Sequence, residues 1–289
     1  MGSGSFTSAS YAAYNTSLGR DYSFTSGRVS GQTFEAHHMD DSLNPRMFTV
    51  RECLNSEEHP NTIPVILALD VTGSMGPSCK ETAETLGIII TNLLKKYQDI
   101  EFCIMGIGDL AYDQAPIQMS QFESDVRIAE ALDKLYLEKG GGGNGYESYT
   151  AAWYMGLHKT KLDCYDKQNR KGIIITMGDE PLNPYLPSYP LQMAIRTGAE
   201  GEVETRQLYD LASKKFDIYH IAVDDAANCY TAYKDEIQKT FGELLGPKFK
   251  VATIDTLAKQ IEDCISESIE GVVNTPATPQ VNENGEISW

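Results

Sequence analysis

Runs of lysine and arginine, long apolar segments and paired cysteine motifs are all missing from this sequence of 289 residues. Its formal net charge of -17 leaves no basic face that could displace counterions from phosphates, so nucleic acid and anionic membrane surfaces are not expected partners. Nowhere do about 18 apolar residues follow one another, which excludes a transmembrane helix. The N-terminus lacks the charged start and apolar core of a secretory signal, and we therefore expect a cytoplasmic protein.

The cysteines show neither a CxxC pair nor a spacing typical of zinc fingers. Cys103 lies within an apolar segment and Cys264 lies on the apolar side of an amphipathic one. Buried free thiols in a reducing compartment are therefore expected, rather than disulfides.

Composition divides the chain into three parts. Residues 1–60 are rich in Ser, Thr and Tyr without a sustained period, and are expected to be extended or ordered only against another surface. Residues 61–270 carry regular apolar patterns and are expected to form one domain. Residues 271–289 are punctuated by Pro and Asn, which is typical of a flexible tail.

Short apolar segments alternate with amphipathic ones through the central part. Strands that are apolar throughout need cover on both faces, which helices supply in a doubly wound sheet. The pattern therefore predicts a Rossmann-like α/β fold with a mostly parallel sheet and helices on both faces. The predicted strands are Val65–Leu69, Phe102–Ile107, Ile173–Thr176, Ile218–Val223 and Lys250–Ile254, with Ala115–Phe122 as an edge strand for which an antiparallel direction is one option. The predicted helices are Lys80–Tyr97, Ser124–Glu138, Ala151–Thr160, Glu204–Phe216, Tyr233–Leu245 and Asp255–Ile269.

The segment "VILALDVTGSMG" (residues 65–76) ends a predicted strand with an acid and two alternating hydroxyls. Asp70, Thr72 and Ser74 are hard oxygen ligands, which suit Mg²⁺, Mn²⁺ or Ca²⁺ and do not suit zinc or copper. A plainer alternative is that Asp70 only ends the strand while a hydroxyl caps the next helix. A cap explains one hydroxyl and leaves the other oxygens unexplained.

Two further polar segments are predicted to lie at the same edge of the sheet, "GGGGNGYES" (residues 140–148) and "TMGDEP" (residues 176–181). Ligands bind beyond the carboxyl ends of the strands in open α/β sheets. The sequence therefore predicts one site that is built from three separate loops.

The residues "ALDVTGSM", followed at once by an amphipathic helix, resemble the metal-ion-dependent adhesion site of von Willebrand factor A domains. In that family the first motif is Asp-x-Ser/Thr-x-Ser, usually followed by Met. The resemblance covers about residues 62–270 and is to bacterial or phage-like intracellular members of the family. It implies a doubly wound fold, a Mg²⁺ site that draws a Thr and an Asp from two further loops, and a partner carboxylate that completes the metal shell.

The family's second and third motifs match this sequence only in part. Where the family has Gly-Gly-Thr before a helix, this chain places Glu147 or Ser148, and Asn144 stays an alternative. Where the family has Thr-Asp-Gly, this chain has "TMGDEP", so that Asp179 arrives two residues late, with Glu180 as second choice.

Two function classes follow. The first is a binding module without enzyme activity, an adaptor that captures an acidic group of a protein partner through Mg²⁺, with Mn²⁺ or Ca²⁺ as alternatives. The second is a phosphatase similar to the haloacid dehalogenases, with Asp70 as nucleophile, Asp179 holding Mg²⁺ and Lys171 balancing the phosphoryl charge. The strand ending "MGIGD" lacks the Ser or Thr that those enzymes need, which favours the binding module. The oligomeric state is left open.

The segment "EPLNPYLPSYPLQ" (residues 180–192) contains four prolines and two tyrosines. It is expected to be either an ordered surface loop or an aromatic rim beside the metal, because tyrosine supplies contact area at low entropic cost.

Overall fold

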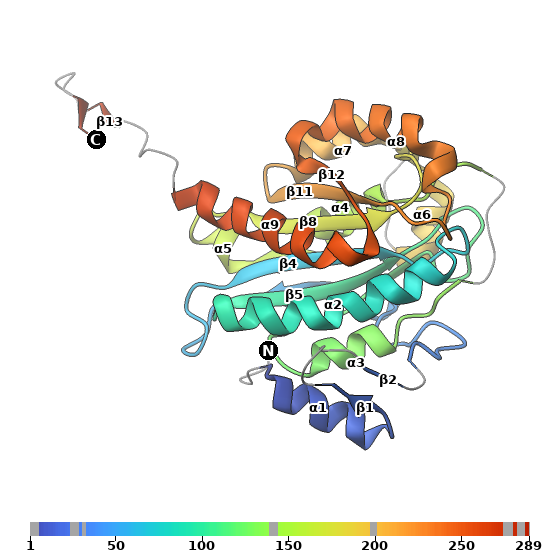
Figure 1. Cartoon of the computed structure of the whole chain (residues 1–289). Helices are drawn as coiled ribbons and strands as arrows, with labels where there is room; N and C mark the ends of the chain where they lie inside the picture. The colour runs from blue at the N-terminus through green and yellow to red at the C-terminus, as the bar shows by residue number, and fades with distance from the viewer. Residues whose placement is uncertain are drawn as a thin grey trace.

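A computed structural model describes residues 6–23, 29–30, 33–138, 144–196, 201–273, 280–281 and 287–288. A six-stranded sheet forms its centre (Figure 1). The strands of this sheet are β4 (Ile63–Asp70), β5 (Ile100–Ile107), β6 (Ile117–Met119), β8 (Gly172–Gly178), β11 (Phe216–Val223) and β12 (Phe249–Ala252).

The strand order is β12-β11-β8-β4-β5-β6. All neighbours are parallel except β6, which runs antiparallel to β5 through Met105–Met119 and Ile107–Ile117 pairs. The predicted α/β fold, its five apolar strands and its antiparallel edge strand are confirmed.

Helices cover both faces of the sheet, because the strands are apolar on both sides. Side chains of β4 alternate: Val65, Leu67 and Leu69 enter the core beneath α2, α3 and α9, whereas Ile66 and Ala68 enter the core beneath α4, α6, α7 and α8 (Figure 1). The helices are α1 (Ser8–Ser17), α2 (Pro77–Lys96), α3 (Arg127–Asp133), α4 (Thr150–His158), α5 (Asp163–Asp166), α6 (Ser188–Ile195), α7 (Thr205–Ala212), α8 (Tyr230–Leu245) and α9 (Ile254–Val273).

Helix α2 directly follows the motif loop. Pro77 stands at its first turn, where the missing N–H costs nothing, and Lys95 and Lys96 in the last turn favour its negative end. Its apolar stripe includes Leu86, Ile89, Ile90 and Leu93, all buried against the sheet. This packing fixes the helix and hence the loop that precedes it.

The N-terminal part packs against the domain. Phe6 and Leu43 are both buried in the core beneath α2, and strand β3 pairs in parallel with β7. The small elements are β1 (Asp21–Tyr22), β2 (Val29–Ser30), the 3-10 helix η1 (Pro45–Met47), β3 (Arg51–Cys53), β7 (Thr160–Leu162), β9 (Tyr185–Leu186), β10 (Val203–Glu204), the 3-10 helix η2 (Gly246–Lys248), β13 (Gln280–Val281) and β14 (Ile287–Ser288).

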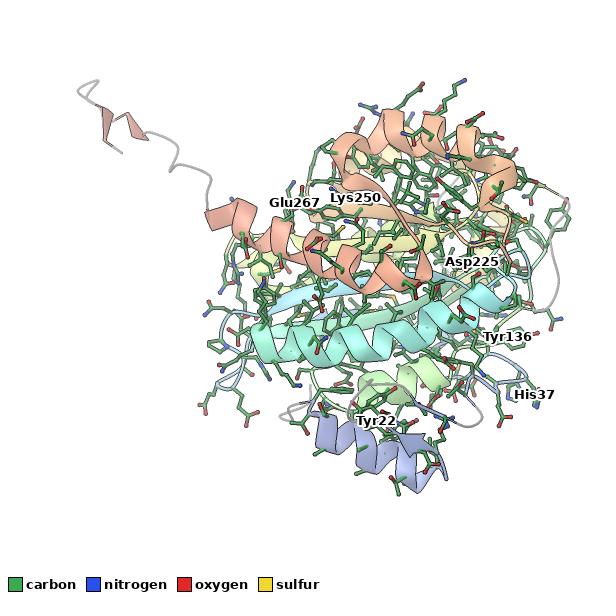
Figure 2. The ribbon with its side chains drawn as sticks, viewed as in Figure 1. Tyr22, His37, Tyr136, Asp225, Lys250 and Glu267 are labelled. Atoms are coloured by element: carbon green, nitrogen blue, oxygen red, sulfur yellow. The ribbon has the colours of Figure 1, made fainter. Side chains whose placement is uncertain are left out.

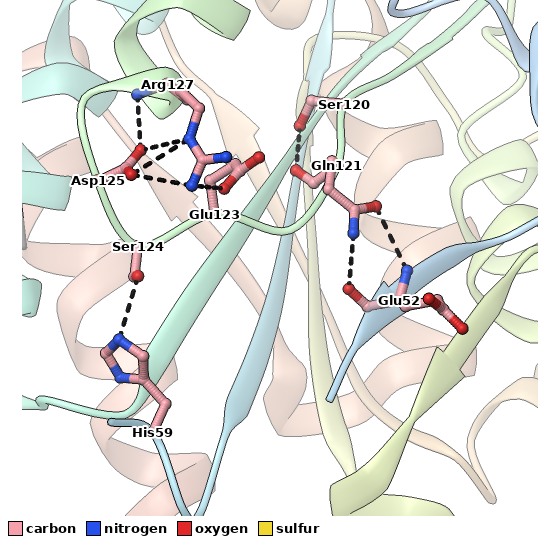
Figure 3. A network of polar contacts seen from close by, with 8 residues as sticks. All are labelled: Glu52, His59, Ser120, Gln121, Glu123, Ser124, Asp125 and Arg127. Carbon is pink, nitrogen blue, oxygen red and sulfur yellow. Dashed lines mark hydrogen bonds and ion pairs between the residues drawn. The ribbon is translucent and has the colours of Figure 1, made fainter. Parts of the chain in front are cut away.

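Polar contacts tie this segment to the loop after β6 (Figure 3). The Gln121 amide donates to the Glu52 carbonyl at 3.0 Å and accepts from the Glu52 N–H at 3.3 Å. His59 Nε2 and Ser124 Oγ lie 3.4 Å apart. At the other side of the molecule, Lys250 and Glu267 form an ion pair of 3.4 Å between β12 and α9 (Figure 2).

Some expectations differ from the structure. The helix predicted over residues 124–138 is only Arg127–Asp133, because Asp125 and Arg127 engage each other at its start. The proline-rich segment is no irregular loop: it contains strand β9 and helix α6. The glycine run at 140–143 lies outside the described residues, as do positions 274–279, 282–286 and 289 of the predicted tail.

All six cysteines are free thiols, and five of them are buried. Among the described helices, none is long and apolar enough to cross a bilayer.

Candidate metal centre

The three predicted loops meet at the carboxyl end of the parallel strands (Figure 1). The first follows β4, the second precedes α4, and the third follows β8. A parallel bridge between Glu147 and Leu182 joins the second loop to the third. The Ser148 N–H donates to the Gly108 carbonyl at 3.3 Å and so joins the second loop to the end of β5.

Asp70 ends β4 and is fully buried. Its Oδ1 accepts the Thr72 N–H at 2.9 Å and the Thr72 hydroxyl at 2.5 Å. Its carbonyl accepts from the Cys79 thiol at 3.2 Å, which ties the strand end to the first turn of α2. The acid therefore folds the motif loop back on itself.

A chain of oxygen atoms continues from there to the third loop. Thr72 Oγ1 and Ser74 Oγ lie 2.9 Å apart, and the Ser74 hydroxyl donates to Asp179 Oδ1 at 3.2 Å. Asp179 Oδ2 accepts the Cys229 N–H at 2.7 Å from the loop after β11. Asp70 and Asp179 are fully buried, whereas Ser74 is half-buried beside exposed Gly73 and forms the open side.

Tyr149 connects all three loops. Its hydroxyl donates to Asp70 Oδ2 at 2.5 Å and accepts the Glu180 N–H at 3.3 Å. Gly178 leaves room for this hydroxyl, since a Cβ there would lie 2.1 Å from it. Sequence reasoning missed Tyr149, because its role comes from a pairing across 79 residues that no local spacing reveals.

The three candidate metal ligands of the second loop differ in burial and in hydrogen bonding. The Ser148 hydroxyl accepts the Leu110 N–H at 3.1 Å and is committed to the loop after β5. Glu147 is 3% exposed, and its Oε2 has no hydrogen-bond partner. Asn144 is exposed. Of the three candidates, Glu147 is the one with a buried side-chain oxygen that has no hydrogen-bond partner and could ligate a metal.

Two further groups belong to this edge although the sequence did not single them out. Asp109 is 2% exposed and its Oδ2 has no partner. It follows β5, so the rule that ligands lie beyond strand ends could have found it. The Cys229 N–H is a backbone donor, which the identity of the residue does not reveal.

Negative charge at this edge is not neutralised by the protein. No ion pair within the described ranges involves Asp70, Asp109, Glu147, Asp179 or Glu180. Burial, followed by the charge of Asp179, raises the pKa of Asp70 well above its usual range. Burial and then the charge of Asp70 raise the pKa of Glu147 to about 11, and burial and the Asp179 charge raise that of Glu180 to about 7.

The donor set fits a small hard cation. Oxygen ligands at about 2.1 Å from an octahedral Mg²⁺ lie about 3 Å from each other. The Thr72–Ser74 and Ser74–Asp179 oxygen pairs, at 2.9 and 3.2 Å, have this spacing. Among the described residues no three His, Cys, Asp or Glu side chains gather closely enough to hold a metal by themselves, so the two hydroxyls are needed in the set.

The arrangement does not suit the phosphatase alternative. Both carboxylate oxygens of Asp70 are engaged in hydrogen bonds, and the side chain is fully buried. Lys171 precedes β8, lies at the opposite end of the sheet, and is 3.9 Å from Asp217. The lysine considered for charge balance is therefore in the wrong place.

No protein-family model matches this sequence, and neither does any curated protein. Among solved structures, the open conformation of the pilus adhesin SpaC from Lactobacillus rhamnosus GG is similar, with a TM-score of 0.52 and 12% identity over 74% of this chain and 31% of SpaC. The chain therefore spans about a third of SpaC. The vWF domain of the type V pili tip protein Mfa5 from Porphyromonas gingivalis has a TM-score of 0.49 and 13% identity over 75% of this chain and 98% of that domain. The VWA domain of SpRpn10 has a TM-score of 0.43 and 10% identity, over 69% and 95%.

At such low identity the likeness to SpaC shows the fold alone. The mostly parallel six-stranded sheet has helices on both faces. This architecture is a doubly wound α/β fold, which SpaC shares over 74% of this chain.

Proposed function

We propose that this protein is a non-enzymatic binding module of the cytoplasm that holds Mg²⁺ at the loop edge and binds an acidic group of a protein partner there. Asp70, Thr72, Ser74 and Asp179 would hold the cation, with Glu147 as the second-loop group. Mn²⁺ and Ca²⁺ are alternative ions for the same oxygen set. The bound ion supplies the positive charge that attracts a partner carboxylate.

One observation carries this proposal: the unbroken series of close oxygen atoms from Asp70 through Thr72 and Ser74 to Asp179. Two loops separated by 105 residues contribute to it. A helix cap would use one hydroxyl and would not need the buried Asp179.

The surroundings favour a protein partner. Three exposed tyrosines stand near the site's loops in the chain: Tyr112 (60% exposed) after β5, Tyr146 (36%) in the second loop and Tyr185 (42%) in β9, which follows the third loop. Tyrosine is enriched at protein interfaces because it presents a large contact area with few rotatable bonds. We infer that Tyr185 of the proline-rich segment belongs to an aromatic rim that contacts the partner.

The test is calorimetric titration of the full chain with Mg²⁺ and with Mn²⁺. We expect one saturable site in the wild type and none in Asp70→Ala. Asp217→Asn serves as the matched control, since it removes one acid at the other end of the sheet and is expected to leave cation binding unchanged. Equal binding in Asp70→Ala and wild type would overturn the metal site.

Capture of the partner group is tested separately with a library of short acidic peptides and their Glu→Gln counterparts. Binding is expected only with the cation present and only for the acidic set. Peptide binding that persists in chelator would show that the cation is not what recognises the partner.

A further inference from the structure

A cavity of about 500 Å³ lies apart from the loop edge, between the N-terminal segment and the domain. Side chains of α1, α2, α3, the loop after β11 and the start of α9 line it. Its volume is within the range of small-molecule sites, about 300 to 1,000 Å³. None of the residues proposed for the cation site lines it.

The N-terminal side of the cavity is fixed by polar links at two places. Thr33 donates its hydroxyl to Glu84 of α2 at 3.0 Å. Asp133 of α3 accepts from the Tyr14 hydroxyl and from Arg20, both at 2.7 Å. These contacts hold the wall of the cavity in place against the domain.

The lining combines two kinds of surface. Tyr11, Phe34, Leu132 and Ile254 contribute apolar surface. Six of the lining side chains are carboxylic acids, and Arg20 is the single basic residue among them. Arg20 is paired with Asp133, and Glu84 lies 3.8 Å from Lys80.

Three of these acids have no ion-pair partner in the described part of the chain: Asp224, Asp225 and Asp255. Asp224 and Asp225 follow β11, and Figure 2 marks Asp225 at the end of the sheet where α2 begins. Asp255 stands in the first turn of α9. The loop after β11 and helix α9 thus bring three carboxylates to one partly open cavity.

We propose that this cavity binds a linear aliphatic polyamine. Ammonium groups would pair with the carboxylates, and the methylene segments between them would lie along the apolar side chains. A metal ion fits the cavity poorly because it is far smaller than the space, and an anion is excluded by the charge. An uncharged apolar ligand would leave the carboxylates desolvated without a partner.

The proposal is tested by titrating the full chain with spermidine in chelator, at low and at physiological salt. Chelator removes divalent cations, so the outcome does not depend on the metal site. We expect one saturable site whose affinity falls as salt rises. The double variant Asp225→Asn/Asp255→Asn is expected to weaken binding about tenfold or more.

The matched control is Asp235→Asn/Glu236→Gln on α8, which removes the same charge from an exposed face away from the cavity. It is expected to bind spermidine within about twofold of wild type. Ala226→Trp, at an exposed position of the lining, is expected to block the cavity without removing charge. Absence of a saturable site would overturn the proposal. An equal loss in the control pair, or full affinity in Ala226→Trp, would do the same, because binding would then be general attraction to an acidic surface.

Discussion

Acidic side chains at the two ends of the central sheet differ in whether a lysine pairs with them. At the amino end, Asp217 of β11 accepts from Lys248 at 2.6 Å and from Ser268 at 2.8 Å, with Lys171 at 3.9 Å. Burial raises its pKa, but Lys248, Ser268 and Lys171 together outweigh burial, so that the net shift of the pKa is downward. At the carboxyl end, Asp70 and Asp179 meet hydroxyls and N–H groups only, and the pKa of each is raised.

An acid paired with a lysine stabilises the fold, whereas an unpaired buried acid does not. A carboxylate with its own lysine is already neutralised and gains little from a cation. Buried carboxylates without one cost folding free energy, and a sequence that retains them at a strand end is typical of a binding site.

The largest stability effect is expected at the amino end. Asp217→Ala leaves Lys248 without its acceptor and should lower the free energy of unfolding by about 2 kcal/mol, less than for a fully buried pair because Lys248 is partly exposed. Urea unfolding in chelator measures it.

Glu147→Gln is the counterpart at the carboxyl end. Because Glu147 Oε2 has no partner, the change should alter the free energy of unfolding by less than about 0.5 kcal/mol. If Glu147→Gln proved as damaging as Asp217→Ala, the contrast between the two ends would fail.

A loss between those of Asp217→Ala and Glu147→Gln is expected for Tyr149→Phe, which removes one hydroxyl and keeps the ring. Asp70 Oδ2 and the Glu180 N–H both lose a partner in a buried place, so we expect a loss of about 1 to 2 kcal/mol. Cation affinity should fall several-fold, since the Asp70 carboxylate is no longer oriented. Calorimetry and urea unfolding on the same samples separate the two effects, and unchanged cation affinity would show that Tyr149 serves stability alone.

The stability contributed by Asp217 is expected to depend on pH. A carboxyl whose pKa is lowered on folding stabilises the protein above its unfolded pKa, near 3.9, and the contribution is lost as pH falls through the folded value. The difference in free energy of unfolding between wild type and Asp217→Asn, about 1 kcal/mol near neutral pH, should therefore shrink below pH of about 4. A difference that stays constant down to pH of about 3 would contradict the downward shift of Asp217.

How much the sequence predicted depended on how local each signal was. The apolar strands and helix α2 were predicted because their periodicity lies within one segment, and Asp70, Thr72 and Ser74 because they are neighbours. The strand-end rule led to the segment 176–181, and the resemblance to the family's third loop led to Asp179 within it. These predictions needed neighbouring residues, a rule about strand ends or a family motif.

The rest depended on contacts across the chain. Tyr149 acts on Asp70 from a distant helix, and the packing of Phe6 and Leu43 into the core is invisible in a segment without periodicity. Helix α6 was missed because its prolines lie where they are tolerated: Pro187 precedes the helix and Pro190 stands in its first turn.

The loop after β11 has one further consequence. Its start, Asp224 and Asp225, borders the acidic cavity, and its end, the Cys229 N–H, holds Asp179 at 2.7 Å. Gly76 of the motif loop packs against the same loop, with the Ala227 carbonyl 2.9 Å from where a Cβ would stand. A ligand in the cavity and a cation at Asp179 would both contact this loop. If either changed the affinity for the other, thermodynamic reciprocity would require the same factor in both directions.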